Sequence, residues 1–234
     1  MCAHLVHGMA VMGLRFRSLD KAARHARIQW WSITLLRRLG ITITVQGTPR
    51  AGATLLVANH VSWLDIAAIH AAAPQARFVS KSDVRQWPLV GRLVAGAGTL
   101  FIERESRRDA LRVVHQMADA LRAGDTVAVF PEGTTGPGRD LLPFHANLLQ
   151  AAIATEIPVQ PVALRFHQPG HAFSPAAEFV GQTTLVQSMW RMACAQGLQV
   201  ELHWLGAEAT AHADRRALAA HLRERINEAL AQAA

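Results

Sequence analysis

The chain has 234 residues, half of them hydrophobic, which is enough for one globular domain with a substantial core. Its two cysteines, Cys2 and Cys194, exclude a disulfide framework and a CxxC metal site, and favour a reducing compartment. The formal charge of +7 is concentrated, because residues 1–50 hold eight basic residues and one acid, whereas the rest hold 16 of each. Such a basic segment indicates an anionic partner, either nucleic acid or a membrane surface.

Residues 1–40 are predicted to form a pair of amphipathic helices. At helical spacing the segment RIQWWSITLLRRLG carries Ile28, Trp31, Leu35 and Leu39. Trp30 and Trp31 suit the lipid headgroup region, so we expect contact with a membrane surface and not with nucleic acid. The alternative is that both helices pack on the protein's own core. No run of about 18 apolar residues occurs, so no transmembrane helix is predicted.

After Gly40 the pattern changes to short apolar runs that alternate with helical segments. Seven runs are predicted to be strands, at residues 41–45, 53–58, 76–80, 98–103, 126–130, 159–166 and 199–205. Residues 106–124 are predicted to form a helix with Leu111, Val114, Ala118 and Leu121 on one apolar face, and a last helix is predicted at about 211–232. This alternation predicts a single α/β domain, residues 41–234, with a central, largely parallel sheet flanked by helices.

Ligands of such sheets bind beyond the carboxyl ends of the strands, and the second predicted strand runs into Asn59 and His60. The following residues, VSWLDIAAIH, are predicted to begin a helix that carries Asp65 about one turn in. The carboxylate could then reach the imidazole Nδ1 and leave Nε2 to take a proton from an alcohol. The alternative is that Asn59 or Ser62 caps the helix and Asp65 only favours its positive end.

Charged residues also follow three other predicted strands. Lys81 follows the third strand, Arg104 ends the fourth, and Glu132 opens a turn after the fifth. The two cations could form a fork for a phosphate, and Glu132 could orient a hydroxyl or an arginine. Each is equally well explained as a solvated charge or a turn residue. Neither GxxxxGK[ST] nor GxGxxG occurs, so a glycine loop for nucleotide phosphates is not indicated.

Four blocks in order, NHVSWLD (59–65), GTLFIER (98–104), FPEGT (130–134) and IPVQPV (157–162), resemble those of the glycerolipid acyltransferases. The bacterial 1-acyl-glycerol-3-phosphate acyltransferases are the most similar group. The resemblance implies a glycerol-3-phosphate acyltransferase-like fold in which His60 is the general base and Asp65 orients it. It also implies an acceptor site formed by Lys81, Arg104, Glu132, Gly133 and Thr134, with the two cations on its phosphate. Family members often have arginine where this chain has Thr135, and Arg139 could replace it.

The resemblance implies acyl transfer from an acyl thioester, of coenzyme A or acyl carrier protein, to the hydroxyl of a lysophospholipid. The expected acceptor is 1-acyl-sn-glycerol-3-phosphate, giving phosphatidic acid, and a lyso-aminolipid such as lyso-ornithine lipid is the alternative. Because the thioester is already activated, the reaction needs no cofactor, metal or acyl-enzyme. The expected location is the cytoplasmic face of the inner membrane, as a peripheral or monotopic protein.

Two other classes stay open. One is a serine hydrolase or thioesterase with Ser62 or Ser80 as nucleophile, although the sequence lacks a GxSxG elbow. The other is a non-catalytic module that binds lipid or carrier protein.

Overall fold

Seven strands form one sheet in the computed structural model, which describes residue 8 and residues 16–86, 90–102 and 107–233. The strands are β1 (Thr42–Gln46), β2 (Thr54–Ala58), β3 (Arg77–Lys81), β4 (Leu100–Ile102), β5 (Thr126–Val129), β6 (Val159–His167) and β7 (Gln199–Trp204). Their order is β1-β7-β6-β2-β5-β3-β4, and each neighbouring pair is parallel except β6 with β7. The predicted α/β class with a largely parallel sheet is confirmed.

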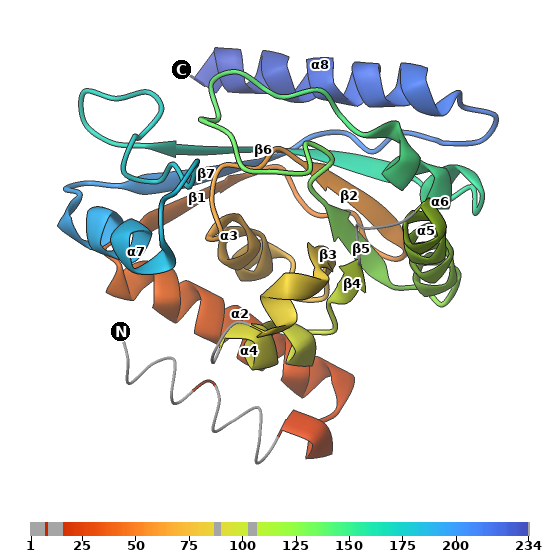
Figure 1. Cartoon of the computed structure of the whole chain (residues 1–234), viewed down its shortest axis with the longest axis horizontal. Helices are drawn as coiled ribbons and strands as arrows, with labels where there is room; N and C mark the ends of the chain where they lie inside the picture. The colour runs from red at the N-terminus through yellow and green to blue at the C-terminus, as the bar shows by residue number, and fades with distance from the viewer. Residues whose placement is uncertain (1–7, 9–15, 87–89, 103–106, 234) are drawn as a thin grey trace.

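Helices cover both faces of the sheet, which gives three layers (Figure 1). One face carries α2 (Lys21–Arg38), α3 (Asp65–Ala72) and α7 (Leu185–Cys194), and the other carries α5 (Arg107–Arg122), α6 (Gln150–Ile153) and α8 (Arg215–Ala233). Shorter elements are η1 (Phe16–Ser18), η2 (Ser82–Gln86), α4 (Val90–Gly96) and η3 (Ala146–Leu149). Because helices cover both faces, β2 and β5 are buried along their whole length, as their unbroken apolar sequences require.

The apolar stripe of α2 packs on the protein itself. Leu35 and Leu39 are 1% and 3% exposed and share a core cluster with residues of the sheet and of α3, and Trp31 packs against that cluster. The expectation that this stripe faces a membrane is therefore wrong, because the sheet and α3 cover it. Residues 1–7 and 9–15, which include most of the first predicted helix, lie outside the described residues. The division of the chain at residue 40 stays a prediction.

Three predicted helices differ in detail from the observed ones. On the apolar face predicted for α5, Ala118 and Leu121 are buried and Val114 packs against the core, whereas Leu111 is 62% exposed and its prediction is wrong. The last helix begins at Arg215, because the Asp214 carboxylate accepts hydrogen bonds from the backbone N–H groups of residues 216 and 217. α3 begins only at Asp65, which is its first residue. Within the described ranges, no helix is both long and apolar enough to cross a membrane.

The strand order places the candidate site. β2 lies between β6 and β5, and all three strands run in the same direction. The segments that leave the carboxyl ends of β2 and β5 therefore meet at one edge of the sheet. These are the segments that contain His60 and Glu132.

Candidate active site

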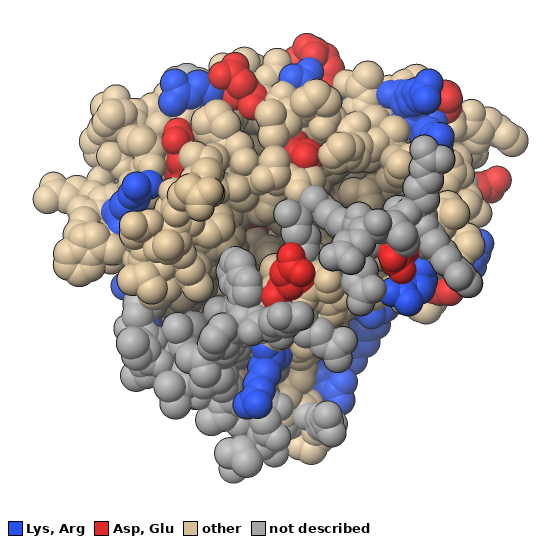
Figure 2. Space-filling view, in the orientation of Figure 1, with Lys and Arg blue, Asp and Glu red and all other residues tan. Residues whose placement is uncertain are grey.

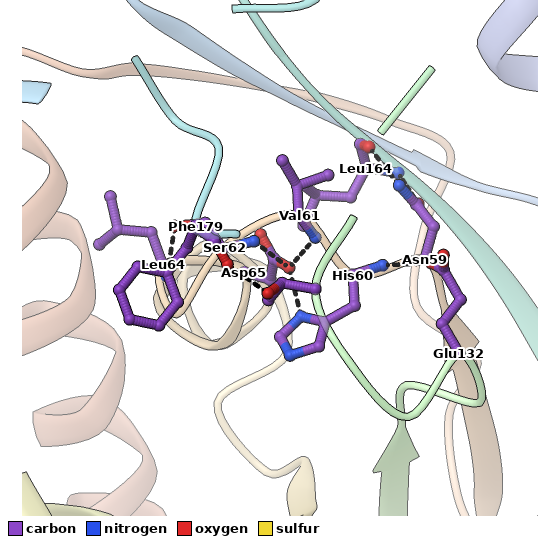
Figure 3. Close-up of polar contacts among 10 residues, drawn as sticks. Asn59, His60, Val61, Ser62, Leu64, Asp65, Glu132, Leu164 and Phe179 are labelled. Carbon is purple, nitrogen blue, oxygen red and sulfur yellow. Dashed lines mark hydrogen bonds and ion pairs between the residues drawn. The ribbon is translucent and has the colours of Figure 1, made fainter. Parts of the chain in front are cut away.

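Asn59 takes the chain out of the sheet after β2. Its side chain is fully buried, donates a hydrogen bond to the Leu164 carbonyl at 2.8 Å and accepts one from the Leu164 N–H at 2.8 Å (Figure 3). The amide thus extends the pairing of β2 with β6 by one step while the backbone turns away. The suggestion that Asn59 caps α3 is wrong, since Leu64 is the N-cap and makes no side-chain capping bond.

Asp65 is the centre of the loop from His60 to Leu64. Its Oδ2 atom accepts three hydrogen bonds, from His60 Nδ1 at 2.7 Å, from the Val61 N–H at 2.7 Å and from the Ser62 N–H at 3.0 Å. The side chain is 0% exposed, and three donors on one oxygen suit a buried carboxylate. The predicted contact of the carboxylate with the imidazole Nδ1 is confirmed, and the alternative, that Asp65 only favours the positive end of the helix, is wrong, although Oδ2 also binds backbone N–H groups. Those groups belong to the loop before α3.

The ring of His60 is held on two sides and open on a third. Since a carboxylate only accepts, Nδ1 carries the proton of the neutral ring and Nε2 keeps its lone pair. The ring stacks on Phe130 with centroids 4.0 Å apart and planes 8° from parallel. Nε2 points away from Asp65 (Figure 3), and the side chain is 19% exposed. A hydroxyl group approaching this edge of the sheet could therefore give its proton to Nε2.

Glu132 holds the backbone of His60 from the neighbouring strand. Its Oε1 accepts a hydrogen bond from the His60 N–H at 2.8 Å, and its Oε2 accepts one from the Leu142 N–H at 2.9 Å. The side chain is 5% exposed, and burial raises the pKa of its carboxyl, although the N–H groups of Leu142 and His60 partly offset this. The sequence suggested that Glu132 orients a hydroxyl or an arginine, whereas its observed partners are backbone amides.

The loop after Glu132 also binds the backbone of His60, and together with Glu132 it forms a clamp on that residue. The Gly136 N–H donates to the His60 carbonyl at 2.8 Å, so both backbone polar groups of His60 are bound by one loop. Gly138 has φ +83°, and a Cβ there would lie 2.9 Å from Val61 Cγ2. Only glycine allows this close approach without strain. Neither Gly136 nor Gly138 lies in one of the four sequence blocks.

The remaining residues of the FPEGTT segment occupy the surface of the same loop. Gly133 has φ +73° and donates its N–H to the Phe130 carbonyl, which forms the predicted turn. Thr134 is exposed. The Thr135 hydroxyl donates to the Phe179 carbonyl, and Arg139 forms an ion pair with Glu178 at 3.6 Å. Thr135 and Arg139, where a family arginine was sought, are thus both engaged within the protein.

The two cations proposed for a phosphate are only partly located. The backbone of Lys81 pairs with Ile102 at the ends of β3 and β4, on the same edge of the sheet as His60. The structure does not describe the side chain of Lys81, and Arg104 lies outside the described residues. No group of three His, Cys, Asp or Glu side chains that could hold a metal ion is present in the described parts of the chain.

Ser62 has an environment unlike that of an exposed nucleophile. It is 0% exposed, and its Oγ lies 3.4 Å from the Leu64 N–H, from which it accepts a hydrogen bond. The next residue, Trp63, donates its Nε1–H to Ser188 Oγ of α7 at 3.1 Å. The sequence gave no signal for this link between the loop and α7, since residues 167–198 contain none of the four blocks.

The chain is similar to several known proteins. The Acyltransferase family model matches residues 41–165. A lyso-ornithine lipid O-acyltransferase of Pseudomonas aeruginosa is 35% identical over 88% of this chain and 79% of its own, and a 1-acyl-sn-glycerol-3-phosphate acyltransferase of Neisseria gonorrhoeae is 34% identical over 82% and 75%. The crystal structure of the 1-acyl-sn-glycerophosphate acyltransferase of Thermotoga maritima superposes with a TM-score of 0.70 at 20% identity, covering 98% of this chain and 93% of its own.

Proposed function

Because the chain belongs to the Acyltransferase family, we propose that it moves a fatty acyl group from an acyl thioester to the free hydroxyl of a lyso-lipid. The observation that carries this proposal is the His60 imidazole, which is bound through Nδ1 to a buried carboxylate and directs Nε2 away from it at the carboxyl edge of the sheet. A base in this position suits the removal of a hydroxyl proton.

In the proposed reaction His60 Nε2 takes the proton of the acceptor hydroxyl as its oxygen attacks the thioester carbonyl. The new C–O bond forms, the C–S bond breaks, and the proton passes from the imidazolium to the departing sulfur. The Asp65 carboxylate stabilises the imidazolium and keeps the ring in the required tautomer. Glu132, Gly136 and Phe130 act as positioning residues, because they hold the backbone and the ring of His60.

The acyl donor is a thioester of either coenzyme A or acyl carrier protein. We propose the cytoplasmic face of the inner membrane as the place of the reaction, where the chain meets both a soluble donor and a lipid acceptor as a peripheral or monotopic protein.

The first acceptor that we propose is 1-acyl-sn-glycerol-3-phosphate, with phosphatidic acid as the product. It is supported by the relative from Neisseria and by the order of the four blocks. Lys81 and Arg104 are the cations proposed to bind its phosphate.

Lyso-ornithine lipid is the second candidate, and a specific observation favours it. Thr135 carries no charge where the family arginine would meet a phosphate, and the nearby Arg139 guanidinium pairs with Glu178 at 3.6 Å. The relative from Pseudomonas is named for this acceptor.

An acceptor panel tests the proposal. Purified full-length protein receives labelled acyl-coenzyme A or acyl carrier protein together with lysophosphatidic acid, lyso-ornithine lipid, or a matched lyso-lipid that lacks the free hydroxyl. We expect thiol release in step with formation of a labelled diacyl lipid, and neither with the deoxy acceptor. Thiol release with free fatty acid from every mixture would identify a hydrolase instead. Binding of substrates without thiol release would identify a non-catalytic module.

A further inference from the structure

The outward face of α7 carries the two most exposed large hydrophobic side chains of the described residues. Val186 is 74% and Trp190 is 72% exposed, and they lie one helical turn apart on the same face. The helix itself is well anchored, because Thr184 and Gln187 form a capping box and Ser188 and Met192 are buried on the opposite face. The ridge formed by Val186 and Trp190 is therefore held in place without a partner of its own among the described residues.

The charges around this ridge favour an anionic partner. Helix α7 contains no acidic residue, and Arg191 is exposed next to Trp190. Helix α2, which covers the same face of the sheet, also contains no acid, and its exposed residues include Arg27, Trp30, Ile33 and Arg37 at helical spacing. In Figure 2 the left edge of the molecule, near the place of α7 in Figure 1, shows Lys or Arg side chains among mostly uncharged residues, with an acidic side chain above them. Exposed tryptophan with nearby arginine is typical of a surface that lies on a lipid headgroup layer.

The buried face of α7 is hydrogen-bonded directly to the loop from His60 to Leu64, which we call the catalytic loop. Ser188 Oγ accepts the hydrogen bond from Trp63 Nε1, and Trp63 lies between His60 and Asp65. Just before α7, the Phe179 N–H donates to the Val61 carbonyl at 3.2 Å. If α7 rests on lipid, a single hydrogen bond therefore joins the lipid-contacting helix to the loop that has to receive a lipid hydroxyl.

We propose that the ridge of Val186 and Trp190, with Arg191, is a bilayer-contacting surface that seats the catalytic loop on anionic phospholipid. The choice of a lipid surface as occupant rests on the proposed function, since an enzyme that acylates lyso-lipids meets its acceptor in a bilayer. The ridge belongs to the C-terminal half of the chain, whereas the exposed residues of α2 lie within residues 1–40, the segment for which the sequence predicts membrane contact.

A site-specific fluorescent label tests the proposal without any catalysis. In full-length protein with Cys2→Ser and Cys194→Ser, Val186→Cys is labelled with a polarity-sensitive fluorophore. The matched control is Leu111→Cys, because Leu111 is 62% exposed on α5, in the opposite layer of the molecule. Both proteins are mixed with vesicles of phosphatidylglycerol and phosphatidylethanolamine that carry quenchers in their acyl chains and contain neither acceptor nor thioester.

We expect emission from position 186 to shift to shorter wavelength and to be quenched by the vesicles, whereas emission from position 111 stays unchanged. Val186→Ser with Trp190→Ser should weaken vesicle binding at least about tenfold, and Leu111→Ser should not. Three results would overturn the proposal. The first is a label at 186 that behaves like the one at 111, and the second is a protein that does not bind the vesicles. The third is a blue shift at high protein concentration in the absence of vesicles, which would identify a second copy of the chain as the occupant. Because no substrate is present, these outcomes do not depend on whether acyl transfer is found.

Discussion

Two histidines lie at the two ends of one row of aromatic rings, and only one of them is placed as a base. His60 stacks on Phe130, Phe130 stacks on Phe78 at 5.6 Å, and Phe78 meets the edge of His70 at 5.0 Å. His60 lies in the loop before α3 and His70 lies inside that helix. The same kind of side chain, in contact with the same aromatic row, thus has two environments.

The two rings differ in partner and in access to solvent. His60 Nδ1 meets the Asp65 carboxylate and its side chain is 19% exposed. His70 is 6% exposed and donates its Nε2–H to the Ala76 carbonyl at 3.0 Å, and burial lowers its pKa to about 4. A neutral, enclosed imidazole stabilises the core, whereas an imidazole with a carboxylate partner and an open nitrogen can accept a proton. The comparison shows that the carboxylate partner and the solvent access of the ring, and not the residue type, distinguish the proposed catalytic histidine.

Removing the charge of the partner should have the largest effect. In Asp65→Asn the amide oxygen can still accept from His60 Nδ1 and from the N–H groups of Val61 and Ser62, so the loop should keep its shape. The imidazolium would lose its counter-charge, and we expect kcat/KM to fall about 10³-fold. Steady-state kinetics measure the loss, and a melting temperature near that of the unaltered protein serves as the control. Unchanged kcat/KM in the folded variant would remove Asp65 from the mechanism.

Loosening the backbone of His60 should have a smaller effect. Glu132→Gln replaces one acceptor by an NH2 group that faces the N–H of His60 or Leu142. We expect kcat to fall about tenfold with little change in KM, and the free energy of unfolding to fall by about 1–3 kcal/mol. The matched control is Glu178→Gln, which removes the charge that Arg139 meets at the surface. If Glu132 instead bound the acceptor, its substitution would raise KM for the acceptor and leave stability unchanged.

The contact of Gly138 with the loop from His60 to Leu64 can be separated from its backbone conformation. Gly138→Ala adds a Cβ 2.9 Å from Val61 Cγ2, whereas Gly170→Ala adds one at a similar φ, +80°, with nothing within 4 Å. Gly170→Ala should cost about 1 kcal/mol of unfolding free energy for its positive φ alone, and Gly138→Ala should cost more, because its Cβ also displaces buried Val61. Only Gly138→Ala should lower kcat, by a few-fold, because only that Cβ displaces the loop. Equal kcat values in the two variants would show that Val61 accommodates the contact.

His70 should affect stability and not activity. Its pKa of about 4 lies below the usual value of 6.5, so its stabilising contribution is complete above pH 6.5 and is lost as the pH falls towards 4. The loss amounts to roughly 3 kcal/mol over that range. Chemical denaturation at a series of pH values should show the same loss in the unaltered protein and in His115→Gln, and a loss smaller by roughly 3 kcal/mol in His70→Gln. An identical slope in all three proteins would contradict this account of His70.

The seven strands and the contact between His60 and Asp65 could be predicted because they depend on local signals: apolar runs, polar strand ends and the four ordered blocks. The function of Glu132 as a clamp could not, since an acid in a turn has many possible partners and only the neighbouring strand selects the His60 N–H. The stripe on α2 shows a similar limit. Helical spacing indicates that a face is apolar, but it does not tell whether lipid or the protein's own sheet covers it.

Helix α7 was missed for a related reason. Its ridge consists of only two large side chains, and its bond to the loop joins Trp63 to Ser188, which are far apart in the sequence. No short motif contains such a pair, so the link becomes visible only when the chain is folded.

The most direct measurement compares the two histidines in one reaction. His60→Gln and His70→Gln are each tested in a single turnover with labelled acyl thioester and lyso-lipid at pH 7.5, after circular dichroism has shown that both are folded. We expect His70→Gln to form the diacyl lipid at the rate of the unaltered protein, and His60→Gln to be slower by about 10³-fold or more. Transfer by His60→Gln at the unaltered rate, or a loss confined to His70→Gln, would contradict the assignment of His60 as the base.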